Sequence, residues 1–201
     1  MIMLKAVILL TGPVERRVLA PILQSHDPRL IVRSVATGAE LAALDPKLLG
    51  CARLVAFCTD TVVPSRVLDR LAFGAYNFHP GSPRFPGWGA ARFAHHQGAR
   101  EFGSTVHVMI EEVDAGPIVG VELFRVPPGS TVSDLEELSY AGLARLFWRQ
   151  APALATRLEP LPELSVQWSG EKCTRRRYAE ISGCGLGVSH AARADLLQAV
   201  A

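Results

Sequence analysis

The 201-residue chain lacks a strong excess of charge of either sign. Its 21 lysine and arginine residues are nearly balanced by 19 aspartate and glutamate residues, which leaves a net charge of +2. A protein that binds nucleic acid usually carries a clustered basic excess. The one basic cluster here, at residues 172–177, is short, and we expect it to be a solvated face. We therefore predict no nucleic-acid partner.

The chain also has few cysteines, and they lack the spacing of a metal or redox site. The four stand at positions 51, 58, 173 and 184, and no C-x-x-C pair occurs. Such thiols are most simply reduced and buried. We therefore predict no metal site and a cytoplasmic location.

Long apolar runs are missing as well, since no run reaches the roughly 20 residues that a membrane span requires. The apolar N-terminus lacks the basic start and cleavage site of a secretory leader. Gly12 is followed by Pro13 rather than by the glycine fingerprint that binds dinucleotides. We expect no membrane partner, and a nicotinamide-dependent oxidoreductase is disfavoured.

What is present is an alternation of short apolar runs with amphipathic stretches. The alternation is typical of βαβ units, and it predicts an α/β fold with a Rossmann-like, mostly parallel sheet flanked by helices. The expected strands cover residues 4–10, 30–35, 54–58, 75–79, 103–110 and 118–126, and the expected helices cover residues 14–22, 40–49, 64–71, 88–97 and a long stretch from 133 onward.

The long helix is expected to begin at Ser133, because Ser133 and Glu136 have the spacing of a capping box. Prolines at 160 and 162 then mark the end of the main domain. We predict a catalytic domain over residues 1–158 and an extension over residues 159–201. The extension is too short to fold alone. We expect it to form helices near 174–181 and 189–200, and to pack on the domain or on a second subunit as a homodimer.

Polar side chains gather between residues 76 and 118, where strands are expected to end. Asn77 and His79 are two residues apart, so on a strand both point to one face. Pro80 cannot continue a central strand, so this strand should end at His79. Asp114 follows in a turn. Because ligands bind outside the carboxyl ends of parallel strands, we predict a site made from an amide, an imidazole and a carboxylate.

Four short motifs occur in order in this stretch. They are Asn77-x-His79-Pro80, Gly87, Gly103-x-Thr105-Val106-His107 and Asp114-x-Gly116-Pro117-Ile118. The ordered set resembles the formyltransferases that use N10-formyltetrahydrofolate, a family that includes glycinamide ribonucleotide, methionyl-tRNA and nucleotide-sugar enzymes. The resemblance covers about residues 4–158. It implies that Asn77, His79 and Asp114 form the catalytic triad.

The resemblance also implies how the ligands bind. The formyl donor would be N10-formyltetrahydrofolate, and the acceptor would be the amine of a small molecule. His107 is expected to support the triad without reacting. The residues expected to line the pterin slot are Phe57, Cys58, Thr59, Val63, Val113, Ala115 and Gly116, and those expected to contact the acceptor are Thr11, Gly12, Ser82 and Arg84. Many members have Ser-Leu-Leu-Pro where residues 81–84 read Gly-Ser-Pro-Arg, so the acceptor stays open.

Formyl transfer to an amine passes through a tetrahedral intermediate with a negative oxygen. Losing one hydrogen-bond donor to such an oxygen typically costs about 10²–10³ in rate. By the resemblance, Asn77 and protonated His79 would be the donors. Asp114 would hold His79 charged and could relay a proton from the amine.

Three functions are compatible with this sequence. The first is formyl transfer to an amine, with an amino-sugar nucleotide as one acceptor class. The second is a formyltetrahydrofolate hydrolase, in which water replaces the amine; the usual hydrolase has an N-terminal regulatory module, which is not visible before Leu4. The third is a catalytically silent folate-binding module that dimerises through its extension.

Overall fold

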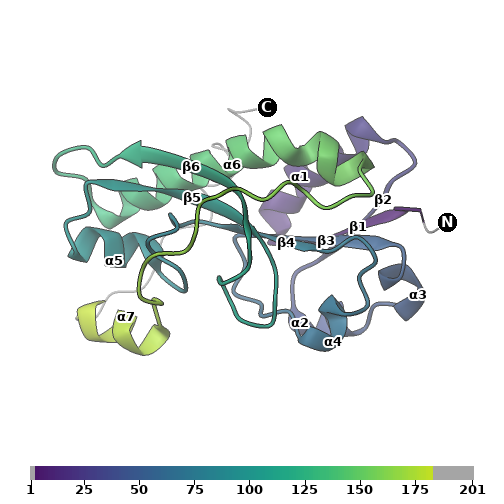
Figure 1. Ribbon diagram of the computed structural model, residues 1–201, viewed down its shortest axis with the longest axis horizontal. Coiled ribbons are helices and arrows are strands. Elements are labelled where there is room, and N and C mark those ends of the chain that lie inside the picture. Colours follow the sequence, from purple (N-terminus) through teal and green to yellow (C-terminus); the bar gives the residue numbers. More distant parts are fainter. Residues whose placement is uncertain (1–2, 183–201) are drawn as a thin grey trace.

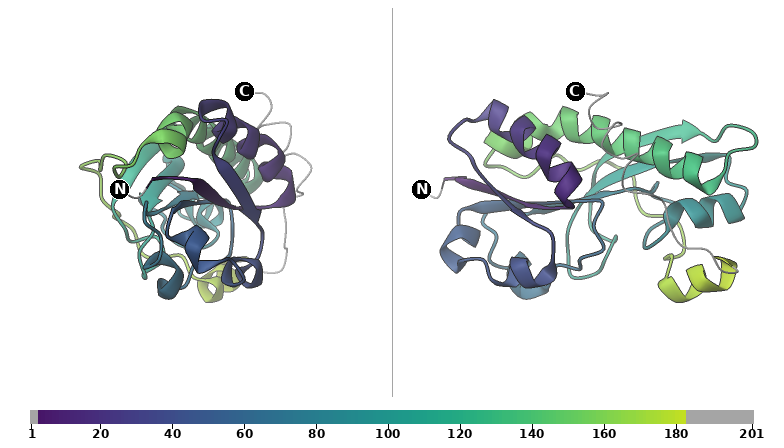
Figure 2. Two further views of the ribbon diagram at one scale, coloured as in Figure 1. Left: turned by 90° about the vertical axis from the view of Figure 1, so that its right-hand side faces the viewer. Right: turned by 180° about the vertical axis from the view of Figure 1, so that it is seen from behind.

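The computed structural model describes residues 3–182, which form one six-stranded sheet between two layers of helices (Figures 1 and 2). The strand order is β2-β1-β3-β4-β5-β6. The first four strands of this order run parallel, and β5 and β6 are antiparallel additions at one edge. The predicted Rossmann-like, mostly parallel sheet is therefore confirmed. The strands are β1 (Ala6–Leu10), β2 (Ile31–Val35), β3 (Ala52–Phe57), β4 (Ala75–His79), β5 (Glu101–Val108) and β6 (Ile118–Arg125).

Two sets of helices cover the two faces of the sheet. The long helices α1 and α6 lie side by side on one face, and the short helices α2, α3 and α4 lie on the other (Figure 2). None of the helices within residues 3–182 combines the length and the apolar character needed to cross a bilayer. The helices are α1 (Pro13–His26), α2 (Gly38–Ala42), α3 (Pro46–Leu49), α4 (Ser65–Leu68), α5 (Ala90–His96), α6 (Val132–Thr156) and α7 (Arg175–Ser182).

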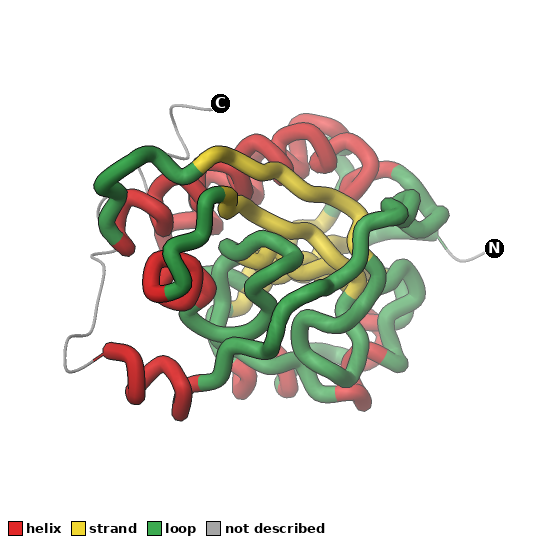
Figure 3. The backbone as a smooth tube through the Cα atoms, turned by 60° about the vertical axis from the view of Figure 1, so that its left-hand side comes forward, coloured by secondary structure: helices red, strands yellow, loops and turns green. Residues whose placement is uncertain are grey.

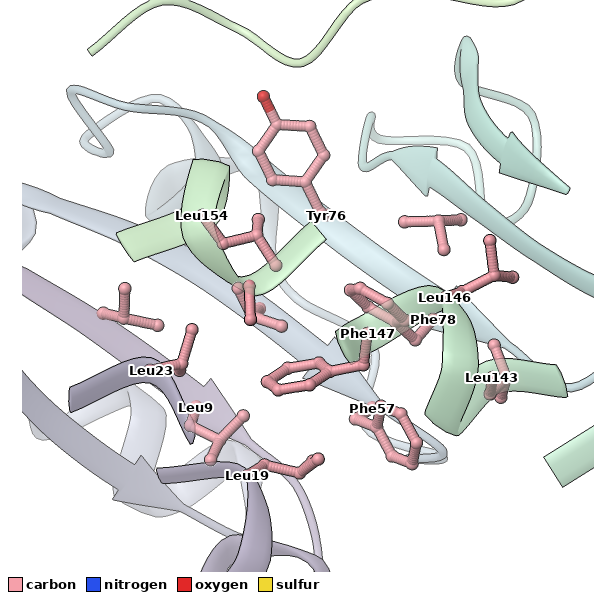
Figure 4. Close-up of a cluster of buried hydrophobic side chains, with 14 of the residues drawn as sticks. Leu9, Leu19, Leu23, Phe57, Tyr76, Phe78, Leu143, Leu146, Phe147 and Leu154 are labelled. Atoms are coloured by element: carbon pink, nitrogen blue, oxygen red, sulfur yellow. The ribbon is translucent and has the colours of Figure 1, made fainter. Parts of the chain in front are cut away.

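The alternation of side chains along the central strands divides the core between the two helix layers. On β1, Leu9 faces α1 and α6, whereas Ile8 faces the short helices, and neither is exposed to solvent. Phe57 at the end of β3 packs edge-on against Phe147 of α6, with ring centroids 5.9 Å apart (Figure 4). Strands buried on both faces explain why the first half of the sequence reads as continuous apolar runs.

The charged side chain of Arg53 lies inside this core. Arg53 of β3 has no solvent exposure, and its guanidinium donates to five backbone carbonyls. Four of these carbonyls belong to the last turn of α6 and the chain just beyond it, where most carbonyls lack an intrahelical partner, although Ala153 also accepts from the Arg157 N–H. Burial lowers the pKa of Arg53. The acceptors are the carbonyl oxygens of Phe73 (3.1 Å), Ala153 (3.0 Å), Leu154 (2.8 Å), Arg157 (3.0 Å) and Glu159 (3.4 Å).

Several predicted element boundaries differ from the structure by two or three residues, and two of them have a clear local reason. The capping box of α6 is formed by Thr131 and Asp134 rather than by Ser133 and Glu136, because the Asp134 carboxylate accepts from the Thr131 N–H at 2.7 Å. Strand β5 ends at Val108, two residues earlier than predicted, where the chain turns away toward β6.

The chain beyond α6 packs on the main domain instead of standing apart. Leu161 is part of the core, and its backbone N–H donates to the Tyr76 hydroxyl at 3.0 Å. The chain then crosses in front of the strands to α7 (Figure 1). Helix α7 matches the basic helix predicted near residues 174–181. The last predicted helix, over residues 189–200, lies outside the described residues.

Candidate active site

The site forms where β4 ends and the β5–β6 turn folds back over it. Asn77 and His79 project from one face of β4, as their spacing predicts. Asp114 reaches them from the turn with a positive φ of 50°. Gly116 makes this turn possible, because a side chain there would collide with the carbonyl of Val108. The structure thus brings together Asn77, His79 and Asp114, although Asn77 and Asp114 are 37 positions apart in the sequence.

The Asp114 carboxylate is the centre of the site, and the side chain that carries it is 4% exposed. Its Oδ1 lies 3.2 Å from the Asn77 amide nitrogen and 3.0 Å from His107 Nε2. Its Oδ2 lies 2.8 Å from the backbone nitrogen of Gly87 and 3.3 Å from His79 Nδ1. Four nitrogen groups therefore surround the four acceptor positions of one carboxylate.

Opposing effects act on the charge of Asp114. Burial alone would raise the pKa of this carboxyl, because a low-dielectric site disfavours the charged form. The positive charge of His79 and the hydrogen bonds from His107 and Gly87 outweigh burial and hold the pKa of Asp114 well below its usual range. Asp114 is therefore ionised at neutral pH, and it is a weak base.

His79 has an acceptor facing each ring nitrogen. Its Nε2 lies 3.0 Å from the carbonyl oxygen of Phe85, and its Nδ1 faces Asp114. Both partners only accept, so the doubly protonated ring satisfies both contacts. Gly81 passes so close to Nε2 that a side chain there would collide with it. His79 can therefore offer an N–H to a bound molecule only by leaving the Phe85 carbonyl.

His107 touches the cluster directly. It pairs in register with Asn77 across β4 and β5, and its Nε2 lies 3.1 Å from the Asn77 amide nitrogen. Its other ring nitrogen lies 2.9 Å from the carbonyl oxygen of Val108, which fixes the ring orientation. This placement fits the predicted supporting role. Residues 3–182 contain no group of three or more His, Cys, Asp or Glu side chains arranged to hold a metal ion.

The residues predicted to line the pterin slot fall into two groups. Phe57 and Val63 are buried in the two cores, so their side chains are not presented to a ligand. The other five residues lie in the loops that surround the site. In the loop after β3, Cys58 is half-buried with a positive φ of 46°, and the Thr59 hydroxyl accepts from the Thr61 N–H. In the loop after β5, Val113 is exposed, Ala115 is half-buried, and the Gly116 carbonyl accepts a hydrogen bond from Trp168.

The residues predicted to contact the acceptor are unequally available. Thr11 is 2% exposed, and its hydroxyl donates to the Phe57 carbonyl at 2.8 Å, which ties the ends of β1 and β3 together. Ser82 is also buried, and Gly12 is half-buried at the N-cap of α1. Arg84 is exposed, with its guanidinium over the Phe85 ring. Of these four, Arg84 alone presents a charged group to solvent.

Trp168 is a site residue that sequence reasoning misses. Its ring centroid lies 5.9 Å from that of His79 and 5.1 Å from that of His107, and its indole N–H donates to the Gly116 carbonyl at 2.9 Å. The only signal in the sequence is a tryptophan within an otherwise polar stretch. A polar stretch does not say where it docks, so its place in the site comes from the tertiary structure.

The class of this protein is shown by its match to a known family. The family model for formyl transferase matches residues 35–140, just over half of the chain. The chain therefore belongs to the formyl transferase family.

Sequence relatives agree with this assignment. The methionyl-tRNA formyltransferase of Bacillus pumilus is 30% identical over 128 residues, which make up 62% of this chain and 38% of that protein. The chain spans about two fifths of the length of the curated relatives it matches.

Solved structures share the fold. A sugar N-formyltransferase from a Shewanella species has a TM-score of 0.73 at 16% identity, covering 98% of this chain and 86% of that one. A formyltransferase from Anoxybacillus kamchatkensis, solved with UDP-4,6-dideoxy-4-formamido-L-AltNAc and tetrahydrofolate, has a TM-score of 0.70 at 17% identity, covering 88% of each chain.

Proposed function

We propose that this protein transfers a formyl group from N10-formyltetrahydrofolate to the amine of a small acceptor at the Asp114 cluster. The observation that carries the proposal is the convergence of Asn77, His79 and Gly87 on one buried carboxylate. A developing oxyanion requires oriented N–H groups. The Asn77 amide carries a second N–H beside the one given to Asp114, and His79 can donate once its ring leaves the Phe85 carbonyl. Membership of the formyl transferase family supports the same reaction class.

In the proposed reaction the acceptor amine attacks the formyl carbon of the donor. The new C–N bond forms as the carbonyl oxygen becomes negative, and Asn77 and His79 stabilise this oxygen by hydrogen bonds. The bond to N10 of the folate then breaks, and the proton lost by the amine passes to N10. Asp114 is too weak a base to take that proton in the rate-limiting step, because its pKa is lowered. Its proposed role is to orient Asn77 and keep His79 positively charged.

The proposed donor is held by the loops after β3 and β5, with Cys58, Thr59, Val113, Ala115 and Gly116 as the lining residues. Two observations support this placement. The loop after β3 lies at the carboxyl end of a parallel strand, where α/β sheets bind ligands. The loop after the antiparallel strand β5 folds back to the same place, since its Asp114 contacts Asn77 and His79. A structure with the same fold contains tetrahydrofolate.

Two acceptor classes have specific support. An amino-sugar nucleotide is favoured by fold neighbours that act on sugars, one of which holds a formamido-sugar nucleotide. Methionyl-tRNA is favoured by the 30% identity with the Bacillus pumilus enzyme. The small net charge of +2 offers little attraction for tRNA, so we place the sugar nucleotide first.

Turnover of N10-formyltetrahydrofolate with and without acceptors tests the proposal. The protein is incubated with the donor alone, with a pool of amino-sugar nucleotides, or with methionyl-tRNA, and the products are followed by absorbance and mass. Acceptor-dependent formylation is the expected result. Equal turnover without an acceptor would identify a hydrolase, binding without turnover would identify a silent module, and absence of binding would contradict the proposal.

We further propose that residues 1–158 are the catalytic unit and that residues 159–201 are its extension. The described part of the extension, residues 159–182, packs on the loops of the site, which supports a role in the same reaction. We also propose that two copies of the protein form a homodimer through the extension. Sedimentation of the full chain tests it, and a concentration-independent monomer would contradict it.

A further inference from the structure

Residues 164–173, here called the strap, run across the mouth of the candidate active site. Figure 3 shows the strap as a green tube that crosses the other loops on its way to α7. The backbone of Ser169 donates to the Pro83 carbonyl at 3.1 Å, and that of Cys173 donates to the Pro86 carbonyl at 2.7 Å. The strap therefore covers the site in this state.

Two glycines show how closely the strap is seated. A side chain at Gly170 would collide with the carbonyl of Arg84, and a side chain at Gly87 would collide with the backbone of Cys173. Gly87 also has a positive φ of 93°, which favours glycine independently of this contact. The strap and residues 84–87 therefore fit closely against each other. A single added methyl group at Gly170 should disturb this contact.

Trp168 is the strap side chain that contacts the two histidines of the site, and Cys173 at the end of the strap is buried in a neighbouring core. Residues 162–167 and 169–172 are exposed, whereas Trp168 is half-buried. Its flat ring lies edge-on to His79 and His107, and its N–H is donated to the backbone carbonyl of Gly116. A flat nitrogen heterocycle that donates to a backbone carbonyl is also the shape and chemistry of the pterin ring. Gly116 is one of the residues that we propose to line the pterin slot.

The anchors beside Trp168 are weak enough to be released. Lys172 pairs with Glu112 at 3.3 Å, and Arg175 at the start of α7 pairs with Asp60 at 3.5 Å. The side chains of both pairs are well exposed, and exposed ion pairs contribute little to stability and are screened by salt. Within residues 164–173 the strap is held by four backbone hydrogen bonds to the rest of the domain, by the Trp168 ring and by the buried Cys173 side chain.

We infer that Trp168 is an intrasteric occupant of the folate subsite, so that the strap must leave before the formyl donor can bind. This inference rests on the proposed function, because it assigns the folate ring to the place of the indole. Release of Trp168 also frees the Gly116 carbonyl for the ligand. The bound donor and the seated strap are then mutually exclusive states.

The inference predicts the sign of a binding change. A ligand that needs a minor state binds more weakly by the fraction of molecules in that state, so freeing the site tightens binding. If the strap is released in about one molecule in ten, Trp168→Ala should tighten binding by about tenfold. A residue that merely positions His79 or stacks on the folate would give the opposite sign.

The test is a calorimetric titration with 5-formyltetrahydrofolate, a stable folate probe, at fixed ionic strength. The expected order of affinity is Trp168→Ala tightest, Gly170→Ala next and the wild type weakest. Gly170→Ala unseats the strap without touching the triad, so it serves if Trp168→Ala fails to fold. Trp148→Ala removes an exposed tryptophan on α6 and should bind like the wild type.

The outcomes separate the inference from the proposed function. If the wild type binds the probe and Trp168→Ala and Gly170→Ala bind it equally or more weakly, the inference is overturned while the proposed function stands. If no variant binds the probe, the proposed function fails and the inference falls with it. Binding that appears only in the strap variants would support both.

Hydrogen exchange in the wild-type protein gives an independent readout. The inference predicts that saturating 5-formyltetrahydrofolate speeds amide exchange at Ser169 and Cys173, because the strap leaves its seat on Pro83 and Pro86. Slower exchange at these amides on folate binding would mean that the strap closes over the ligand, and would overturn the inference. Unchanged exchange at full saturation would overturn it as well.

Discussion

Asp114 and Arg53 are two buried charges that the same fold satisfies in opposite ways. Asp114 contacts mainly side chains, by hydrogen bonds with Asn77 and His107 and an ion pair with His79, and these side chains can also donate to other molecules. Arg53 donates to backbone carbonyls only, all fixed by secondary structure or the chain next to it. The first arrangement can exchange partners and therefore suits chemistry. The second cannot, and it stabilises the end of α6 against β3.

The largest expected effect is on the Asp114 side of this comparison. Asp114→Asn should lower formyl transfer by about 10³-fold, because a neutral amide cannot hold His79 charged or accept from all four nitrogens. Steady-state turnover measures the effect. Glu111→Gln removes an exposed acidic group three residues away and should keep wild-type rates. Near-normal turnover in Asp114→Asn would contradict the proposed role.

The matching change on the other side should affect folding rather than ligand binding. Arg53→Met removes the side-chain donor to the Leu154 and Arg157 carbonyls, and we expect a loss of about 3 kcal/mol in the free energy of unfolding. Urea unfolding measures it, with the exposed Arg70→Met as control. Below its melting temperature the variant should still bind 5-formyltetrahydrofolate normally. An Arg53→Met variant that is as stable as the wild type but does not bind 5-formyltetrahydrofolate would contradict the claim that Arg53 serves folding and Asp114 serves the site.

Acid titration distinguishes the two charges by their pH dependence. The pKa of Asp114 is lower in the folded state than in the unfolded state, so its stabilisation is present above the unfolded value near 3.9 and is lost as pH falls below it. The free energy of unfolding of the wild type should therefore decline below about pH 4. Asp114→Asn should show a shallower decline, whereas Arg53→Met should keep the wild-type slope. Parallel slopes for the wild type and Asp114→Asn would contradict the lowered pKa.

The smallest expected effect concerns the other end of the helix that Arg53 caps. Thr131→Ala removes the side-chain cap of α6 and should cost about 1 kcal/mol in the free energy of unfolding. Ser133→Ala, two residues into the helix, is the matched control and should have little effect. Urea unfolding of both variants measures the difference. If Ser133→Ala lost more free energy of unfolding than Thr131→Ala, Ser133 would be the cap of α6, as the sequence predicts.

The same contrast explains how far the sequence could predict the structure. Asn77, His79 and Asp114 can be recognised by their residue types and by the order of the motifs that contain them, so the sequence predicts that they act together. The sheet could be predicted because its central strands are buried on both faces and read as apolar runs. The roles of Arg53 and Trp168 could not be predicted, because their partners are backbone carbonyls 20 to 106 positions away. Backbone carbonyls leave no mark in a sequence.

Small boundary errors have a similar origin. Ser133 and Thr131 both offer a hydroxyl three residues before an acidic side chain, and only the path of the preceding loop decides which one caps the helix. Phe57 and Val63 belong to the predicted ligand loop by position, yet the pleat of β3 and the turn before α4 direct their side chains into the cores. Sequence order gives the loop, and packing decides which side chains in it face outward.

The most direct test of the central claim, that one carboxylate organises the reacting groups, is a double-mutant cycle on turnover. Asn77→Ala, Asp114→Asn and the double variant are compared with the wild type in the formylation assay. If Asn77 acts as part of the unit held by Asp114, each single change should lower the rate by about 10² or more, and the double variant should be little slower than the slower single variant. Rate losses that multiply in the double variant, or near-normal rates in the single variants, would contradict the account.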